Sequence, residues 1–361
     1  MKNKINLLII LPLLLLLVSC NTNTKNKSLY ILNWGDYINY DLLTKFEKKY
    51  NVEVIISEVE SNEAMYEQIK MNRTSFDIAI PSDYMIDQLE QEHLLKPIDF
   101  SLLKNYHRDM FTDIALEHAP ASKNYIPYFN GTIGIMYNKD HIKDIQKVIE
   151  QNDWGVLFNK SLLKNARVGM YNSSRDAFAS ALLYNNYSIN TTDERELNTA
   201  YQSLKSFNYT MYGDDNLKRN IVTGNLDLSL VYSGDFYEEL IVATDEGKPI
   251  NFGYFVPERT NYWQDGLVIP KDSKNYELAH KFIDFMLEDD NAIENAVYIG
   301  YASPLKSVMS YLRSNSEFDF LTNDPFYDPA TIKNLQAESF KFLGVDYMVK
   351  LEELFTKSKS N

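Results

Sequence analysis

The sequence is almost without cysteine and poor in histidine. Among its 361 residues there are one cysteine, Cys20, and five histidines. A single cysteine permits no internal disulfide, so a hydrophobic core has to stabilise the folded chain. The histidines stand far apart, and there is no H-E-x-x-H, EF-hand, P-loop, G-x-G-x-x-G or G-x-S-x-G motif. We therefore expect neither a bound metal ion nor a cofactor.

Positive charge is also scarce. Lys and Arg number 36 against 50 Asp and Glu, a formal net charge of −14, and removing Lys2 and Lys4 with a leader makes it −16. A surface of this sign repels phosphate groups and attracts cations. We expect no nucleic-acid partner.

Long apolar runs are missing except at the N-terminus. Lys2 and Lys4 precede an apolar segment at 5–18, which ends in Leu-Val-Ser-Cys. This pattern is typical of a signal peptide, and the segment is too short for a membrane-spanning helix. The last four residues resemble the bacterial lipobox, which predicts a lipoprotein signal peptide at 1–19, a lipid on Cys20 and a polar tether at 20–27. An ordinary cleaved signal with an incidental cysteine is the alternative. The predicted location is the periplasm or cell envelope, with the lipid anchored to a membrane.

The rest of the chain repeats one pattern, a short apolar strand followed by an amphipathic helix. The pairs are 28–34 with 40–50, 52–60 with 61–72, 76–82 with 83–95, 166–172 with 174–186, and 226–234 with 235–247. A further strand is expected at 262–270. Such alternation predicts an α/β fold with mostly parallel sheets. The roughly 340 residues beyond the leader favour two lobes over a single core.

Acidic and aromatic residues gather where these strands end. They are Trp34, Asp36 and Tyr37; Ser82, Asp83 and Tyr84; Asp176; Tyr232 and Asp235; Trp263 and Asp265; and, in a later loop, Tyr301. Ligands of open α/β sheets bind at this edge. Taken singly, some have plainer roles: Ser173 with Asp176 fits a helix capping box, and Ser82 or Asp235 could cap a helix.

Acids and aromatic rings together suit one kind of ligand. Carboxylates accept hydrogen bonds from ammonium groups, and aromatic faces pack alkyl chains and attract cations, worth roughly 0.5–2 kcal/mol per ring. A metal site would need a tight cluster of oxygen or histidine ligands instead. The set predicts a site for an elongated aliphatic polycation.

On these stretches the chain resembles the periplasmic spermidine/putrescine-binding proteins of ABC importers. The stretches are "LYILNWGDYI", "VESNEAMYEQI", "FDIAIPSDY", "YIPYFNGTIGIMYN", "SRDAFASALLYNNYSINTTD", "YWQDGLVIPKDSKNYELAHKFIDFML", "IGYASP" and "TIKNLQAE". The resemblance covers nearly the whole mature length. It implies a two-lobed periplasmic-binding-protein fold with mixed, mostly parallel sheets and crossing hinge strands. It also implies a monomer that traps a polyamine between its lobes and delivers it to ABC permease subunits.

The resemblance also implies ligand-binding positions. The aromatic ones are Trp34, Tyr37, Tyr84, Tyr232, Trp263 and Tyr301. The polar ones are Asp36, Ser82, Asp176, Asp235, Asp265 and Glu338. Tyr232 stands where the family usually has Trp, which weakens stacking there.

Three departures leave the choice of polyamine open. Ser173 replaces a second acid of spermidine binders, and Glu338 stands about where they carry Gln. Asp235, in "YSGD", resembles instead the putrescine-preferring members, whose motif is Trp-x-Gly-Asp. The site therefore looks like a mixture of the diamine and triamine types.

The lobes are expected to interdigitate in sequence, with lobe 1 at 28–136 plus 263–304 and lobe 2 at 137–262 plus 305–356. Other functions stay open at this point. One is a two-lobed binding lipoprotein for another solute, such as a different amine or a chelated metal. Another is an acid/base hydrolase that uses two cleft carboxylates. A third is a surface lipoprotein that binds a host or envelope partner.

Overall fold

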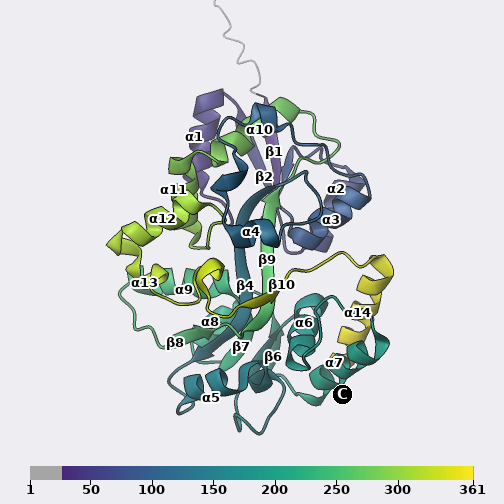
Figure 1. Cartoon of the computed structure of the whole chain (residues 1–361), viewed down its shortest axis with the longest axis vertical. Coiled ribbons are helices and arrows are strands. Elements are labelled where there is room, and N and C mark those ends of the chain that lie inside the picture. Colours follow the sequence, from purple (N-terminus) through teal and green to yellow (C-terminus); the bar gives the residue numbers. More distant parts are fainter. Residues whose placement is uncertain (1–26, 361) are drawn as a thin grey trace, which may run out of the picture.

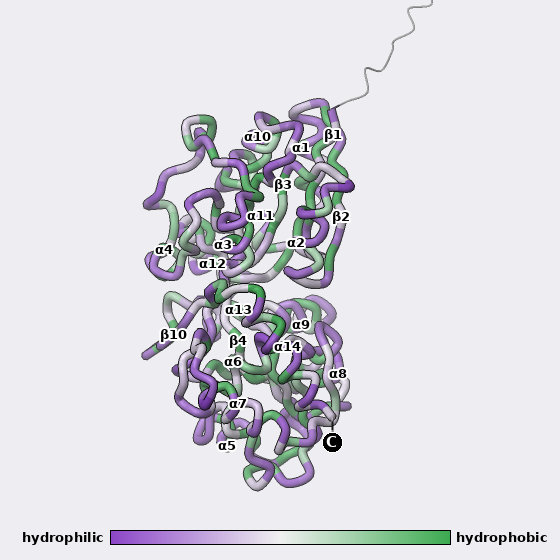
Figure 2. Tube along the Cα trace, turned by 90° about the vertical axis from the view of Figure 1, so that its right-hand side faces the viewer, coloured by the Kyte–Doolittle hydropathy of each residue, from purple (hydrophilic) through white to green (hydrophobic). Residues whose placement is uncertain are grey.

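The computed structural model describes residues 27–360, so the predicted signal peptide, the lipidation site Cys20 and the tether up to residue 26 lie outside the described residues. The described chain forms two halves, one above the other, each with strands covered by helices (Figures 1 and 2). This confirms the predicted two-lobed α/β architecture. Among residues 27–360, no helix combines the length and apolar character needed to cross a membrane.

The strands are β1 Ser28–Trp34, β2 Glu53–Val59, β3 Ile78–Ala79, β4 Ile126–Asn138, β5 Val168–Tyr171, β6 Met211–Gly213, β7 Leu228–Tyr232, β8 Phe252–Phe255, β9 Arg259–Leu267 and β10 Gln336–Glu338. The α-helices are α1 Tyr40–Tyr50, α2 Asn62–Met71, α3 Asp83–Gln91, α4 Asp113–Glu117, α5 Ile145–Asn152, α6 Ser174–Tyr184, α7 Glu194–Ser206, α8 Asn216–Val222, α9 Ser233–Asp245, α10 Tyr276–Met286, α11 Asp289–Ile299, α12 Lys306–Ser314, α13 Asp319–Thr322 and α14 Val345–Lys359. Short 3₁₀ turns lie at Phe100–Leu102, Arg108–Met110, Asp153–Leu157, Ser316–Phe318 and Pro329–Thr331.

Two sheets organise the halves. The first has the order β2-β1-β3 and is parallel throughout. The second has the order β10-β9-β4-β7-β5-β6, with β8 also paired to β4. Within it β5 runs parallel to β6 and β7, whereas β4 is antiparallel to β7, β8 and β9. The pairings are thus mixed: the first sheet is parallel, and the antiparallel pairings of the second all involve β4.

Strands β4 and β9 run through both halves (Figure 1). The first part of β4 pairs with β9, and its second part pairs with β7 and β8. The end of β9 and the residue after it meet the chain at and after β3 through isolated bridges, Ser82 with Asp265 and Ala79 with Val268. All thirteen residues of β4 are buried, as expected of a strand that crosses the middle of the molecule. The lobe limits given above stay a prediction.

Local sequence signals explain where the helices begin and end. At the start of α1, Asn39 Oδ1 accepts a hydrogen bond from the Asp41 amide at 2.9 Å. Lys48 and Lys49 stand in the last turn, where cations favour the helix dipole, and Asn51 ends the helix at φ 53°. The predicted elements at 28–34 and 40–50 match β1 and α1. By contrast, β3 is much shorter than the predicted strand 76–82, because only Ile78 and Ala79 pair with β1.

Candidate functional site

Four of the predicted aromatic residues form one chain of ring contacts. The ring centroids of Tyr37 and Tyr301 are 5.5 Å apart, those of Tyr301 and Trp263 are 5.8 Å apart, and those of Trp263 and Tyr232 are 6.0 Å apart. These rings come from the turn after β1, the loop after α11, the strand β9 and the end of β7. The structure thus brings together residues that lie more than 250 positions apart in the sequence, from both halves.

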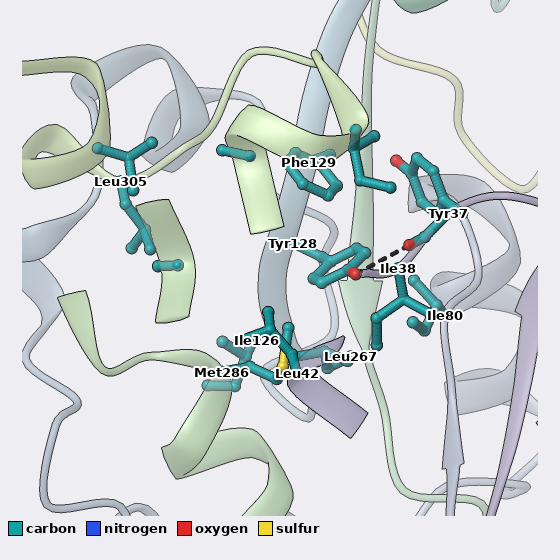
Figure 3. Packing of buried hydrophobic residues seen from close by; sticks show 14 of the residues in the cluster. Tyr37, Ile38, Leu42, Ile80, Ile126, Tyr128, Phe129, Leu267, Met286 and Leu305 are labelled. Carbon is teal, nitrogen blue, oxygen red and sulfur yellow. Dashed lines mark hydrogen bonds between the residues drawn. The ribbon is translucent and has the colours of Figure 1, made fainter. Parts of the chain in front are cut away.

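The polar groups behind Tyr37 fix this ring in place. The Tyr128 hydroxyl donates to the Tyr37 carbonyl at 2.9 Å, and Figure 3 shows this bond within a packed apolar layer. Asn295 Nδ2 donates to the Tyr128 hydroxyl, also at 2.9 Å. Phe129 packs against Tyr37 with centroids 5.4 Å apart. The ring cluster is therefore built on a rigid support from β4 and α11.

Two glycines make room for the cluster. A Cβ on Gly131 would lie 2.6 Å from the Trp263 ring, and one on Gly234 would lie 2.0 Å from the Tyr301 ring. Both distances are far below van der Waals contact. The backbone of β4 and the first turn of α9 thus act as the surfaces on which these two rings rest.

Replacing Gly234 by alanine tests this packing. Alanine is the better helix former, so Gly234→Ala should leave α9 intact and displace the Tyr301 ring. We expect ligand affinity to fall at least about fivefold in calorimetry, since overpacking costs about 1–3 kcal/mol. Gly35→Ala is the control, because its Cβ would meet only Glu58 Oε2 at 3.8 Å. Equal affinities for the two variants would contradict the role of Gly234.

Asp265 is a buried carboxylate next to the cluster. Its side chain is 6% exposed, and Oδ2 accepts a hydrogen bond from the Tyr37 hydroxyl at 2.8 Å. Burial raises the pKa of Asp265 to about 6, against the lowering effect of nearby Ser82 and Tyr37. Within residues 27–360, its Oδ1 has no hydrogen-bond partner. A buried acid with a spare oxygen can accept a donor that the protein itself does not provide.

Asp176 has a similar environment at the start of α6. It is 5% exposed, and within the described part of the chain its Oδ1 lacks a hydrogen-bond partner. Burial raises its pKa, while contacts with Ser173 and Tyr232 lower it. Ser173 Oγ also accepts from the Asp176 amide at 3.4 Å, so the predicted cap by Ser173 is present. The cap uses the Asp176 backbone and leaves its carboxylate available.

Asp235 differs, because it is already paired. Lys218 of α8 is only 4% exposed, and its Nζ lies 3.0 Å from Asp235 Oδ1 and 2.6 Å from Glu238 Oε2. Burial lowers the pKa of Lys218, but these carboxylates outweigh burial and hold the pKa above its usual range. Burial raises the pKa of Asp235 to about 6 despite the lysine. Helix α9 begins at Ser233 with Tyr232 at the N-cap position, so the alternative of Asp235 as an N-cap is wrong.

Four further predicted site residues, Trp34, Asp36, Tyr84 and Glu338, are not part of the chain of ring contacts. Asp36 is exposed, in a turn with φ 50°, and the half-buried Trp34 donates from Nε1 to the Ile80 carbonyl at 2.8 Å. The Tyr84 ring is covered by the Arg175 guanidinium, 3.8 Å from the centroid, and Glu338 is engaged by Ser188 and Arg259. The side chains of Trp34, Tyr84 and Glu338 are therefore engaged by other groups of the protein.

Ser82 is placed close to Asp265 by an isolated β-bridge between the two residues. Its hydroxyl accepts from Asn62 Nδ2 at 3.1 Å and makes no cap bond to α3. Ser82 therefore occupies the N-cap position of α3, as the alternative expects, but its side chain makes no capping hydrogen bond.

Sequence reasoning missed three residues of this region. Lys218 carries no local signal, because a lysine on a short helix ordinarily faces solvent. Asp83 stands among the strand-end residues but not among the predicted ligand-binding positions, and it is 2% exposed with a pKa that burial raises well above the usual value. Tyr128 lies in the strand "YIPYFNG", and its support of Tyr37 depends on a contact 91 positions away.

Residues 27–360 contain no group of three His, Cys, Asp or Glu side chains that could hold a metal ion.

Comparisons with known proteins agree with this geometry. Residues 41–317 match the family model of the bacterial extracellular solute-binding proteins. The chain is 34% identical to a spermidine/putrescine-binding periplasmic protein of Salmonella typhimurium, over 77% of this chain and 78% of that one. It is 26% identical to a putrescine/cadaverine-binding protein of Pseudomonas aeruginosa, over 93% and 94%.

A solved structure gives the same result for the fold. The spermidine/putrescine ABC transporter substrate-binding protein of Streptococcus pneumoniae is 32% identical and superposes with a TM-score of 0.76. The match covers 92% of this chain and 98% of that chain. The chain therefore belongs to the family of bacterial extracellular solute-binding proteins.

Proposed function

We propose that this protein is the substrate-binding component of an ABC importer and captures an aliphatic polyamine between its two halves. The names of the Salmonella and Pseudomonas relatives support the ligand class. One observation carries the proposal: two buried carboxylates, Asp176 and Asp265, each keep an unpartnered oxygen among residues 27–360 and flank a chain of aromatic rings.

Each part of the ligand would find a matching group. An ammonium group donates to the spare oxygen of Asp265, and a second one donates to that of Asp176. The rings of Tyr37, Tyr301 and Trp263 pack the methylene chain between them and exclude water. An anionic ligand would meet the two unpartnered carboxylates of Asp176 and Asp265 beside the rings, so the site disfavours it. Asp36, Tyr84 and Glu338 stay predictions as ligand contacts.

The arrangement also supports a closing motion. Asp265 lies beside Ser82 of the first half, whereas Asp176 and Tyr232 start or end elements of the second half. A ligand that bridges both sets stabilises the closed form over an open one, which is a population shift. The closed form would then present a defined surface to the membrane permease. The lipid on Cys20 would keep the protein near that membrane. We also propose that the protein is a monomer.

We propose transport rather than catalysis as its role. The raised pKa of Asp265 would also suit an acid/base catalyst, so the two functions need separate tests. Calorimetry of the soluble domain with putrescine and with spermidine should give saturable binding. Mass spectrometry of the recovered polyamine should find it chemically unchanged. Absence of heat with both ligands would overturn the proposal, and a cleaved product would favour the hydrolase.

A further inference from the structure

The ion pair of Lys218 with Asp235 is the feature of the site that the polyamine-binding function does not use. Both side chains are 4% exposed, and the lysine bridges Asp235 of α9 and the partly exposed Glu238, one turn further along that helix. A lysine this deep needs an anionic partner, because an unpaired buried charge is very costly. Asp235 supplies this partner.

The ammonium group of Lys218 lies next to Asp235, where a ligand ammonium group would have to lie to bind that carboxylate. Its Nζ is chemically equivalent to the terminal ammonium of a polyamine, and it makes with Asp235 the contact that a bound amine would make. It is also covalently attached, so its local concentration does not depend on the solution. A free amine would have to displace it and leave the lysine buried without that partner.

The other acids of the region can then be counted. Glu338 is engaged by Ser188 and Arg259, and Asp36 is exposed. Asp83 is 2% exposed, and its Oδ1 accepts from the Tyr84 amide while its Oδ2 has no hydrogen-bond partner among residues 27–360. Its charge acts on Tyr125 and Tyr262, which are not among the rings of the site. Ser173 carries no charge. Of the three buried carboxylates with a spare oxygen among residues 27–360, Asp176 and Asp265 are the two that contact the ring cluster, through Tyr232 and Tyr37.

We propose that Lys218 is a built-in counter-ion of the binding site, which neutralises Asp235 and leaves two carboxylates for ligand ammonium groups, so that the protein selects a diamine over a triamine. The inference rests on the proposed function and adds its ligand selectivity. Lys218 acts through Asp235 and does not touch the ligand, which makes it a positioning residue.

The selectivity ratio of putrescine to spermidine is the measurement that tests this role. The wild type should bind putrescine at least tenfold more tightly than spermidine in calorimetry. Lys218→Met removes the counter-ion and exposes Asp235 to a third ammonium group, so the ratio should shift at least tenfold toward spermidine. Lys218→Arg keeps the positive charge and should keep the wild-type preference. A purely structural lysine would change both affinities alike and leave the ratio unmoved.

A double variant covers the case in which Lys218→Met does not fold. Lys218→Met combined with Asp235→Asn removes both charges of the pair together, which buried pairs often tolerate. If Lys218 already satisfies Asp235, this variant should bind putrescine within tenfold of the wild type and show no gain for spermidine. A larger loss of putrescine affinity would mean that Asp235 contacts the ligand, and it would overturn the proposal.

The outcomes separate this inference from the proposed function. A wild type that binds neither polyamine refutes the function itself. A wild type that binds spermidine as tightly as putrescine refutes only the counter-ion role, as does a Lys218→Met variant with an unchanged ratio. Each result is read from the same titrations.

Discussion

Asp265→Asn should lower polyamine affinity at least about thirtyfold while it raises the stability of the ligand-free protein. The substitution keeps the size of the side chain and its acceptor for the Tyr37 hydroxyl, which lies 2.8 Å from Oδ2. It removes the negative charge that would meet an ammonium group. Truncating one partner of a buried, hydrogen-bonded charge pair costs roughly 2–5 kcal/mol, which is about thirtyfold or more in affinity.

Asp265→Asn should raise the free energy of unfolding, although it weakens binding, because the buried charge of Asp265 destabilises the folded state. The folded protein holds Asp265 with a pKa of about 6, above the value of about 3.9 in an unfolded chain. Near neutral pH the fold therefore carries the cost of a buried charge, on the order of 2 kcal/mol, which a neutral amide avoids. Thermal unfolding of the ligand-free proteins measures this part. A variant that loses affinity and stability together would show damage to the fold.

Asp41→Asn is a suitable control for charge alone. Asp41 stands in the first turn of α1 and is exposed, so it lies outside the ring cluster. We expect a change in affinity below threefold from this variant. If both variants weaken binding equally, the overall negative charge of the protein accounts for the affinity, and Asp265 has no special contact.

The turn "NWGDYI" shows what can be predicted from the sequence and what cannot. Its position after a strand predicts a ligand-facing edge, and Tyr37 is indeed buried against Asp265 and Tyr301. Alternation of strands and helices predicts the α/β fold because it depends on local periodicity. Which side chain of a turn faces inward depends on backbone dihedrals, and Asp36 adopts φ 50° and faces solvent.

The sequence alone does not show which side chains contact each other across long stretches of chain. Lys218 and Asp235 are 17 positions apart, in the helices that precede and follow β7 along the chain, and no periodic pattern links them. Arg175 covers the Tyr84 ring from 91 positions away, in the other half of the molecule. A residue-by-residue resemblance identifies which side chains face the ligand in relatives. It cannot tell which of these side chains has already found a partner inside this protein.

Polyamine affinity should fall about tenfold between pH 7.5 and pH 5. The raised pKa of Asp265, about 6, means that the ligand-free site takes up a proton as the pH drops through this value. The proton and the ammonium group compete for the same carboxylate, whereas the ligand amines stay charged because alkyl amines titrate near pH 10. Burial also raises the pKa of Asp176, so it adds to the fall.

Protonation of Asp265 has the opposite effect on folding: it weakens ligand binding but favours the folded state. Because its folded pKa lies above the unfolded value, Asp265 favours the folded state most at low pH, and this contribution is lost as the pH rises from about 4 to about 6. Acidification should thus weaken binding without unfolding the protein through this group. Calorimetry near pH 6 in two buffers of different ionisation enthalpy should detect release of protons on binding. Asp265→Asn should release fewer protons, and equal proton release by both proteins would refute the competition at Asp265.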